Sequence, residues 1–225
     1  MIIGLLACDH IQKEFADYTE LFKNLLPRFE FEVYNVCEGV FPKSSMQCDA
    51  WLITGSKYSV YDDIDWIIWL KAFVKEIANA NKHCIGVCFG HQMLGEAMGG
   101  EVRKAEQGWC VGVHQFEILE QEVWMKPKCK EVNLLMSCQD QVVILPPNSK
   151  ILAKSPTCPV GIMQIGSRML GIQGHPEFST DYVKYLMRDR TNRIGSDVVE
   201  RGTKSLSVET QNSIVAQWII NFIES

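Results

Sequence analysis

The sequence predicts an α/β fold built on a doubly wound, mostly parallel sheet with a small antiparallel extension. Apolar runs alternate with segments of helical periodicity through about the first hundred residues, and β-α-β-α order is typical of parallel sheets covered by helices on both faces. Short apolar runs then follow one another, separated by turn residues such as Pro146-Pro147-Asn148. That pattern predicts the antiparallel extension.

The first half is expected to hold four buried strands, at residues 2–8, 31–36, 50–54 and 83–87. Helices are expected between them. The apolar positions of the first recur at helical spacing: Phe15, Tyr18, Phe22 and Leu25. The second begins after the acidic segment 62–65, and its inner face is Trp66, Leu70, Phe73, Val74 and Ile77. A third helix, at 91–98, follows the fourth strand.

The second half is expected to hold six short strands, at 113–119, 132–137, 141–145, 151–153, 160–165 and 169–173, the last joining the parallel part of the sheet. A helix is expected at 178–188, and the polar segment 191–206 is interpreted as a loop. The final helix carries one apolar face: Ile214, Val215, Trp218, Ile219, Phe222 and Ile223. No repeat or linker interrupts the chain, so residues 1–225 are expected to form a single domain.

Composition excludes several classes of function. Acidic residues outnumber basic ones by 27 to 22 and no basic stripe appears, so nucleic-acid binding is not expected. The apolar runs are too short to cross a bilayer, and no signal peptide is evident. Nine scattered cysteines favour reduced thiols and a cytoplasmic location over a disulfide framework. They form no paired clusters of the kind that bind zinc, so no metal is expected.

Two motifs carry chemistry. Cys88 is central in Gly86-Val-Cys88-Phe-Gly90, between a predicted strand and a predicted helix, and small residues are what a sharp strand-to-helix elbow requires. His175-Pro-Glu177 follows another apolar run. A thiol, a histidine base and a carboxylate that orients the base are the parts of an acyl-transfer triad. The start of a helix beside Cys88 would favour the thiolate.

These motifs resemble the class I (triad-type) glutamine amidotransferase family. Gly86-Val-Cys88-Phe-Gly90-His91-Gln92 and Gln173-Gly-His175-Pro-Glu177 carry the resemblance, together with Thr54-Gly55-Ser56 and Met136-Ser-Cys-Gln-Asp140. The resemblance extends over most of the chain, and the family includes the glutaminase domain of GMP synthetase. It implies a flavodoxin-like fold. Phe89, directly after the cysteine, excludes the ThiJ-type proteins, which have histidine there.

The resemblance also implies roles. Cys88 would attack a γ-glutamyl carbonyl, His175 would transfer the proton, and Glu177 would hold the imidazole. Backbone N–H groups of Gly55 and Phe89 would form the oxyanion hole. The glutamyl end would be held by Gln92, Ser137 and Cys138. No cofactor is implied.

Two departures from the family pattern bear on the substrate. Cys138 replaces a common histidine, and Gly174 replaces a common phenylalanine in a position where plant γ-glutamyl peptidases resemble this chain. The leading hypothesis is glutamine hydrolysis, with ammonia supplied to a separate synthetase, because no nucleotide-binding Gly-rich loop is present. A stand-alone γ-glutamyl peptide hydrolase and a non-catalytic binding protein of the same fold are the alternatives.

Overall fold

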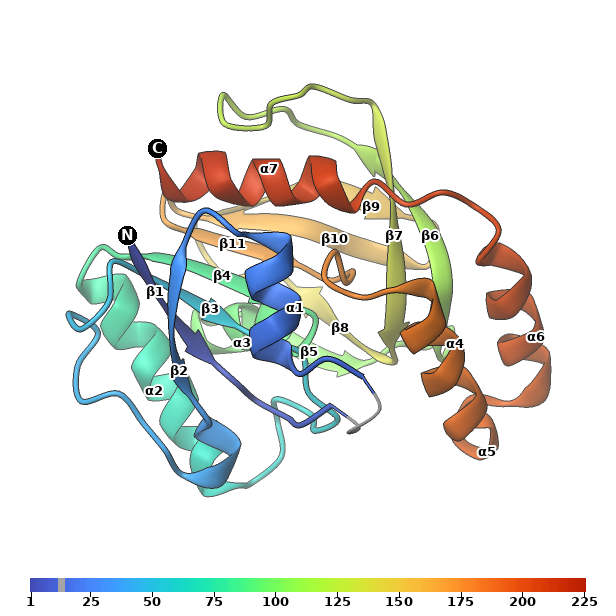
Figure 1. Cartoon of the computed structure of the whole chain (residues 1–225), viewed down its shortest axis with the longest axis horizontal. Coiled ribbons are helices and arrows are strands. Elements are labelled where there is room, and N and C mark those ends of the chain that lie inside the picture. The colour runs from blue at the N-terminus through green and yellow to red at the C-terminus, as the bar shows by residue number, and fades with distance from the viewer. Residues whose placement is uncertain (12–14) are drawn as a thin grey trace.

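The structure is a computed structural model that describes residues 1–11 and 15–225. A nine-stranded sheet in the order β2-β1-β3-β4-β11-β10-β9-β6-β7 runs through the molecule, and β5 and β8 form a separate pair (Figure 1). No helix within the described residues has both the length and the apolar character needed to cross a bilayer.

The parallel part of the sheet has five strands, each pairing in parallel with its neighbour. They are β2 (Glu30–Tyr34), β1 (Ile2–Leu6), β3 (Ala50–Ile53), β4 (His83–Val87) and β11 (Met169–Ile172). Because these strands run the same way, Gly55 and Cys88 follow β3 and β4 at one edge of the sheet. Ligands of parallel α/β sheets bind at that edge.

The remaining strands are antiparallel. They are β10 (Cys158–Ile165), β9 (Ser149–Ser155), β6 (Cys110–Ile118) and β7 (Glu131–Cys138) in the large sheet, and β5 (Glu101–Lys104) with β8 (Asp140–Ile144) in the small one. β10 joins the two parts by pairing antiparallel with β11. The predicted fold class is therefore confirmed.

Helices cover both faces of the sheet and enclose two apolar cores. The helices are α1 (Tyr18–Leu25), α2 (Asp65–Asn79), α3 (Phe89–Ala97), α4 (Thr180–Asp189), α5 (Thr191–Ile194), α6 (Ser196–Ser205) and α7 (Asn212–Ile223), with a 3₁₀ turn at Val36–Glu38. Successive strand residues point to opposite faces. In β3, Leu52 therefore joins the core under α1, α4 and α7, whereas Trp51 joins the core under α2 and α3.

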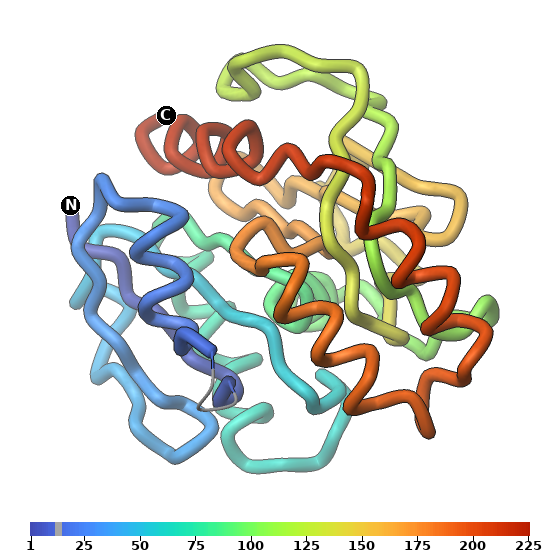
Figure 2. The backbone as a smooth tube through the Cα atoms, turned by 45° about the vertical axis from the view of Figure 1, so that its right-hand side comes forward, coloured from blue at the N-terminus to red at the C-terminus, as the bar shows by residue number. Residues whose placement is uncertain are grey.

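The prediction of a loop at 191–206 is wrong, since α5 and α6 occupy this segment. The segment does not resemble a helix in sequence because its apolar positions are few. Helix α6 has no broad apolar stripe. It packs on β6 through Gly202, where a β carbon would lie 2.8 Å from a methyl carbon of Val111. Ser205 Oγ also accepts a hydrogen bond of 2.8 Å from the Val113 N–H. Figure 2 shows this C-terminal segment beside β6. The strand β5 was not predicted, because three of its four residues are charged.

The turn from β4 into α3 depends on close backbone contact. A β carbon on Gly90 would overlap the carbonyl oxygen of Ile53 in β3, and backbone cannot move aside as a side chain does. Gly90→Ala is therefore expected to lower the free energy of unfolding by about 3 kcal/mol, measured by urea denaturation followed by circular dichroism.

The matched control is Gly95→Ala in the same helix. Its β carbon would meet only the ends of side chains, a Val142 methyl at 3.0 Å and the Met163 methyl at 3.5 Å, and alanine gains about 1 kcal/mol of helix propensity over glycine. We expect a change within about 1 kcal/mol. Equal stabilities of the two variants would contradict this account of the turn.

Candidate active site

Cys88 lies at the turn between β4 and α3 with a strained backbone. Its φ of 52° and ψ of −102° fall in a region that residues other than glycine rarely adopt. Gly86 permits this turn, because a β carbon there would overlap the backbone of Gly90. The turn places the Cys88 thiol, 6% exposed, at the N-terminal end of α3, where the helix dipole favours an anion.

His175 and Glu177 form a buried pair. The imidazole Nδ1 and the carboxylate Oε1 are 2.7 Å apart, and the two side chains are 3% and 0% exposed. The His175 N–H donates to the Leu135 carbonyl of β7 at 2.8 Å, which fixes the backbone. Phe178 stacks on the imidazole, with ring centroids 3.9 Å apart and an interplanar angle of 7°. The ring is therefore held by a hydrogen bond at its edge and by a packed face.

The charges around His175 favour its protonated form. Burial acts to lower the pKa of the imidazole, but the negative charges of Glu177 and Cys88 outweigh it and raise the pKa above its usual value. A histidine that carries a proton beside a thiolate is the state that a Cys-His pair uses for nucleophilic attack. The arrangement is thus suited to acid–base chemistry on a thiol.

The structure places Gly55 against both groups. A β carbon at Gly55 would lie 3.1 Å from His175 Cε1 and 3.8 Å from Cys88 Cβ, so the loop after β3 borders the thiol and the imidazole together. Phe89 follows Cys88 as the first residue of α3. The N–H of such a residue has no acceptor within its own helix.

The three residues expected to bind the glutamyl end lie near Cys88 but differ in their surroundings. Gln92 is 3% exposed, and its Nε2 donates to the Asp140 carbonyl at 2.7 Å and to Gln173 Oε1 at 3.2 Å. The Ser137 hydroxyl is buried and has no hydrogen-bond partner among the described residues. Burial is the main cause that raises the pKa of the Cys138 thiol, and the nearby Cys88 adds to it. The Gln92 amide is thus held by protein groups, whereas the Ser137 hydroxyl has no such partner in the part of the chain that the structure describes.

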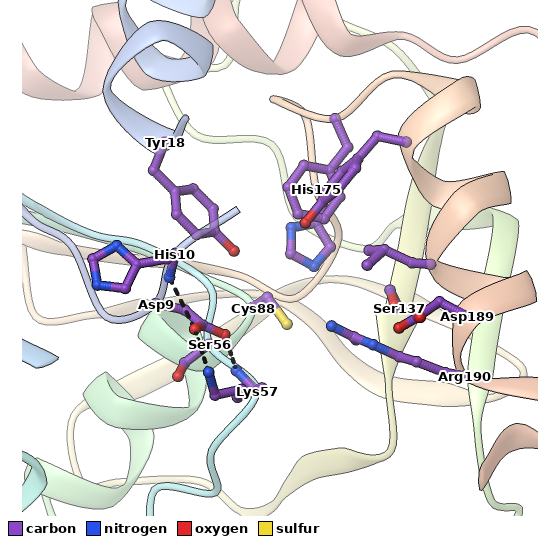
Figure 3. Close-up of a pocket in the computed structure, with 13 residues that line it drawn as sticks. Asp9, His10, Tyr18, Ser56, Lys57, Cys88, Ser137, His175, Asp189 and Arg190 are labelled. Carbon is purple, nitrogen blue, oxygen red and sulfur yellow. Dashed lines mark hydrogen bonds and ion pairs between the residues drawn. The ribbon is translucent and has the colours of Figure 1, made fainter. Parts of the chain in front are cut away.

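Cys88 lies where two lobes of a cleft meet, and Figure 3 shows the first of these lobes. The lobe that we call the His175 lobe is lined by His175, Phe178, Tyr18, Tyr182, Asp9 and Asp189. The other, the Gln92 lobe, is lined by Gln92, Cys138, Asp140, Lys104, Trp109 and Arg193. Cys88, Ser137, Ser56, Lys57 and Arg190 border both. Each lobe encloses about 600 Å³ when its open mouth is included.

Sequence reasoning missed several of these lining residues. Arg190 follows α4 directly and carries no motif, and Tyr18 was interpreted only as part of a helix face packed in the core. Tyr18 does lie in the core, at 8% exposure, but its hydroxyl borders Gly55. An apolar pattern predicts burial and says nothing of which polar tip reaches a cleft, so no signal in the sequence identified either residue.

Asp140 connects the loop after β3 to the Gln92 lobe. Its carboxylate accepts hydrogen bonds from Ser59 Oγ at 2.5 Å and from Tyr61 OH at 3.1 Å, while its carbonyl binds Gln92. One residue at the start of β8 thus restrains both the loop that carries Gly55 and the side chain of Gln92.

Asp140→Ala is expected to loosen this loop. Loss of two hydrogen bonds to a charged acceptor should lower the free energy of local opening by about 2 kcal/mol, which corresponds to roughly 30-fold faster exchange of the Ser59 amide hydrogen. Hydrogen exchange read by NMR measures it. Tyr61→Phe removes only the longer bond and should change the rate less than about fivefold. Unchanged exchange in Asp140→Ala would show that the loop is held by other contacts.

Comparison with known proteins decides the family. The family model described as glutamine amidotransferase class-I matches residues 29–190. The chain belongs to the class I glutamine amidotransferase family. Among relatives of this amidotransferase-family chain, gamma-glutamyl peptidase 4 of Arabidopsis thaliana is 31% identical over 179 residues, 76% of this chain and 71% of that protein. A putative glutamine amidotransferase of Saccharomyces cerevisiae is 34% identical over 162 residues, 68% of this chain and 63% of that protein.

Two more distant matches are a GMP synthase and a solved structure. A glutamine-hydrolyzing GMP synthase of Aeropyrum pernix is 26% identical over 157 residues, 66% of this chain and 30% of that protein. The crystal structure of a glutamine amidotransferase from Thermotoga maritima superposes with a TM-score of 0.77 and 16% identity, covering 99% of both chains. This second likeness shows a shared fold.

Proposed function

We propose that this amidotransferase-family protein hydrolyses γ-glutamyl amide bonds, with Cys88 as nucleophile, His175 as proton carrier and Glu177 as the group that orients the imidazole. The observation that carries the proposal is the buried 2.7 Å pair of His175 and Glu177 in a cleft that the strained Cys88 also lines. Strained residues of this kind cluster at functional sites, where the strain is part of the mechanism.

In the proposed reaction the Cys88 thiolate attacks the γ-carbonyl carbon. The resulting oxyanion accepts hydrogen bonds from the N–H groups of Gly55 and Phe89, a contribution often worth about 3–4 kcal/mol of barrier. The C–N bond then breaks while the His175 imidazolium gives its proton to the departing nitrogen. Water, deprotonated by His175, attacks the thioester, and glutamate leaves with restoration of the thiol.

Substrate placement follows from the positions of these groups. The acid that protonates the departing nitrogen has to be within hydrogen-bond reach of it, so the leaving group belongs in the His175 lobe. The glutamyl amino-acid end then occupies the Gln92 lobe, where Ser137 offers a buried hydroxyl that no protein group binds within the described part of the chain.

The leaving group separates two candidate substrates. Glutamine would release ammonia, which a separate synthetase could use, and the likeness to a glutamine-hydrolyzing GMP synthase supports that interpretation. γ-Glutamyl peptides would release an amino acid or peptide, and the likeness to gamma-glutamyl peptidases supports this second interpretation. All nine cysteines are free, in keeping with action in a reducing compartment such as the cytoplasm.

Glutamate release from glutamine, glutathione and γ-glutamyl dipeptides tests the proposal. We expect turnover of at least one of these substrates by the wild-type protein and none above background by a Cys88→Ala blank. Turnover of glutamine alone would favour ammonia supply, and preference for peptides would favour a self-sufficient hydrolase. Equal rates in wild type and blank would overturn the proposed chemistry.

A further inference from the structure

Arg190 is a cation at the junction of the two lobes. The proposed hydrolysis does not use it. It follows the last residue of α4 and is half-buried. Figure 3 shows its side chain pointing toward Cys88 from the side opposite Lys57. It lies close enough to Tyr182 for its charge to oppose the rise that burial causes in the pKa of that phenol.

Two of the other cations of the cleft already have partners, and Lys104 is exposed and borders only the Gln92 lobe. Lys57 Nζ lies 3.1 Å from Asp9 Oδ1, and the Lys57 N–H donates to Asp9 Oδ2 at 2.9 Å, so Asp9 neutralises this lysine. Arg193, which borders only the Gln92 lobe, lies over the Trp109 ring at 5.5 Å.

Arg190 differs from them. Within residues 1–11 and 15–225, no acidic side chain forms an ion pair with its guanidinium and no hydrogen bond joins it to another side chain. Asp189 borders the same lobe without pairing with it. A half-buried guanidinium that faces a cleft is suited to bidentate recognition of a carboxylate.

We propose that the His175 lobe is a leaving-group site for amino acids, in which Arg190 binds the carboxylate of the amino acid released from the γ-glutamyl bond. This inference rests on the proposed function for the placement of the scissile bond. The nitrogen that receives the proton from His175 belongs to the released residue, whose carboxylate is two bonds farther along. That carboxylate therefore lies near the thiol and the imidazole, where Arg190 can bind it. Ammonia, the product from glutamine, has no group for Arg190 to bind.

The same guanidinium also borders the Gln92 lobe, where it would instead meet the α-carboxylate of the glutamyl end. Three ligands separate these assignments. Glutamine and γ-glutamylethylamide carry only the glutamyl carboxylate, whereas γ-glutamylglycine adds the carboxylate of the leaving residue at nearly the same size.

The experiment is calorimetric binding of these three ligands to the protein in a Cys88→Ala background, which prevents turnover in the proposed mechanism. Arg190→Gln is expected to weaken binding of γ-glutamylglycine by about 10- to 100-fold and to change binding of the other two by less than about threefold. Arg190→Lys should retain part of the affinity. Arg188→Gln, an exposed arginine on α4 that borders neither lobe, should bind all three ligands as the parent does.

An equal loss for all three ligands would assign Arg190 to the glutamyl carboxylate and overturn the proposal. Unchanged binding of γ-glutamylglycine, or failure of the parent to bind it more tightly than γ-glutamylethylamide, would also overturn it. The binding measurement stands apart from catalysis. A wild-type protein that binds γ-glutamylglycine through Arg190 but releases no glutamate would refute the proposed hydrolysis and leave the carboxylate site supported.

Discussion

Replacing Cys88 by alanine is expected to abolish γ-glutamyl hydrolysis while the fold is retained. No other thiol borders the His175 lobe among the described residues, so none can take over the attack on a carbonyl placed there. Loss of a nucleophile of this kind lowers kcat by about 10⁴-fold or more. Glutamate release measures the loss. Wild-type protein should also react selectively at Cys88 with a diazo-ketone analogue of glutamine.

Cys129→Ser is the matched control for labelling, because it removes a half-buried thiol that borders neither lobe. It should be labelled and should turn over substrate as wild type does. Labelling of wild type at the rate of an ordinary thiol, or activity in Cys88→Ala above roughly one part in a hundred of wild type, would contradict the role of Cys88.

A stability measurement on the same position separates strain from chemistry. At φ 52° and ψ −102°, alanine keeps the steric penalty of a β carbon, whereas glycine has none. Cys88→Gly is therefore expected to unfold with a free energy about 1 kcal/mol higher than Cys88→Ala, although both are inactive. A glycine variant less stable than the alanine variant would show that the backbone at Cys88 is unstrained.

The sequence predicts the parallel part of the fold well because each strand and helix there carries its own pattern. All residues of His83–Val87 are buried, and α2 buries every residue that its predicted inner face contains. The elbow motif follows the same logic, since Gly86 contacts the backbone of Gly90, four residues along the chain. Such local constraints depend on a few neighbouring residues.

Features that depend on distant contacts could not be predicted. Helix α6 is held by Gly202 and Ser205 against β6, and neither residue indicates a helix in its own surroundings. Arg190 reaches the cleft only because α4 packs along β7 and ends there. The contacts of Asp140 with Ser59 and Tyr61 join segments about eighty residues apart. In each of these places, contacts between elements determine the structure, because residue type and spacing along the chain do not determine it.

Glu177→Gln is expected to lower kcat by about 10³- to 10⁴-fold with little change in KM. Glutamine is close to glutamate in size and still accepts a hydrogen bond from His175 Nδ1, but it carries no charge. The charge of Glu177 is the largest cause that raises the pKa of the buried His175 against the opposing effect of burial. Without it, the imidazolium that protonates the departing nitrogen is less stable.

The pH dependence of activity tests the direction in which the pKa of His175 changes. A group whose folded pKa is raised keeps its proton to higher pH, and the protonated state is lost as pH rises through that pKa. Activity of the wild type should therefore fall on the alkaline side only as His175 deprotonates. In Glu177→Gln the pKa of His175 falls, so the alkaline limb of kcat/KM should move to lower pH. Asp181→Asn, which removes an exposed charge from α4, should leave both rate and limb in place. An alkaline limb that stays where the wild type has it would mean that Glu177 holds the ring without setting its protonation.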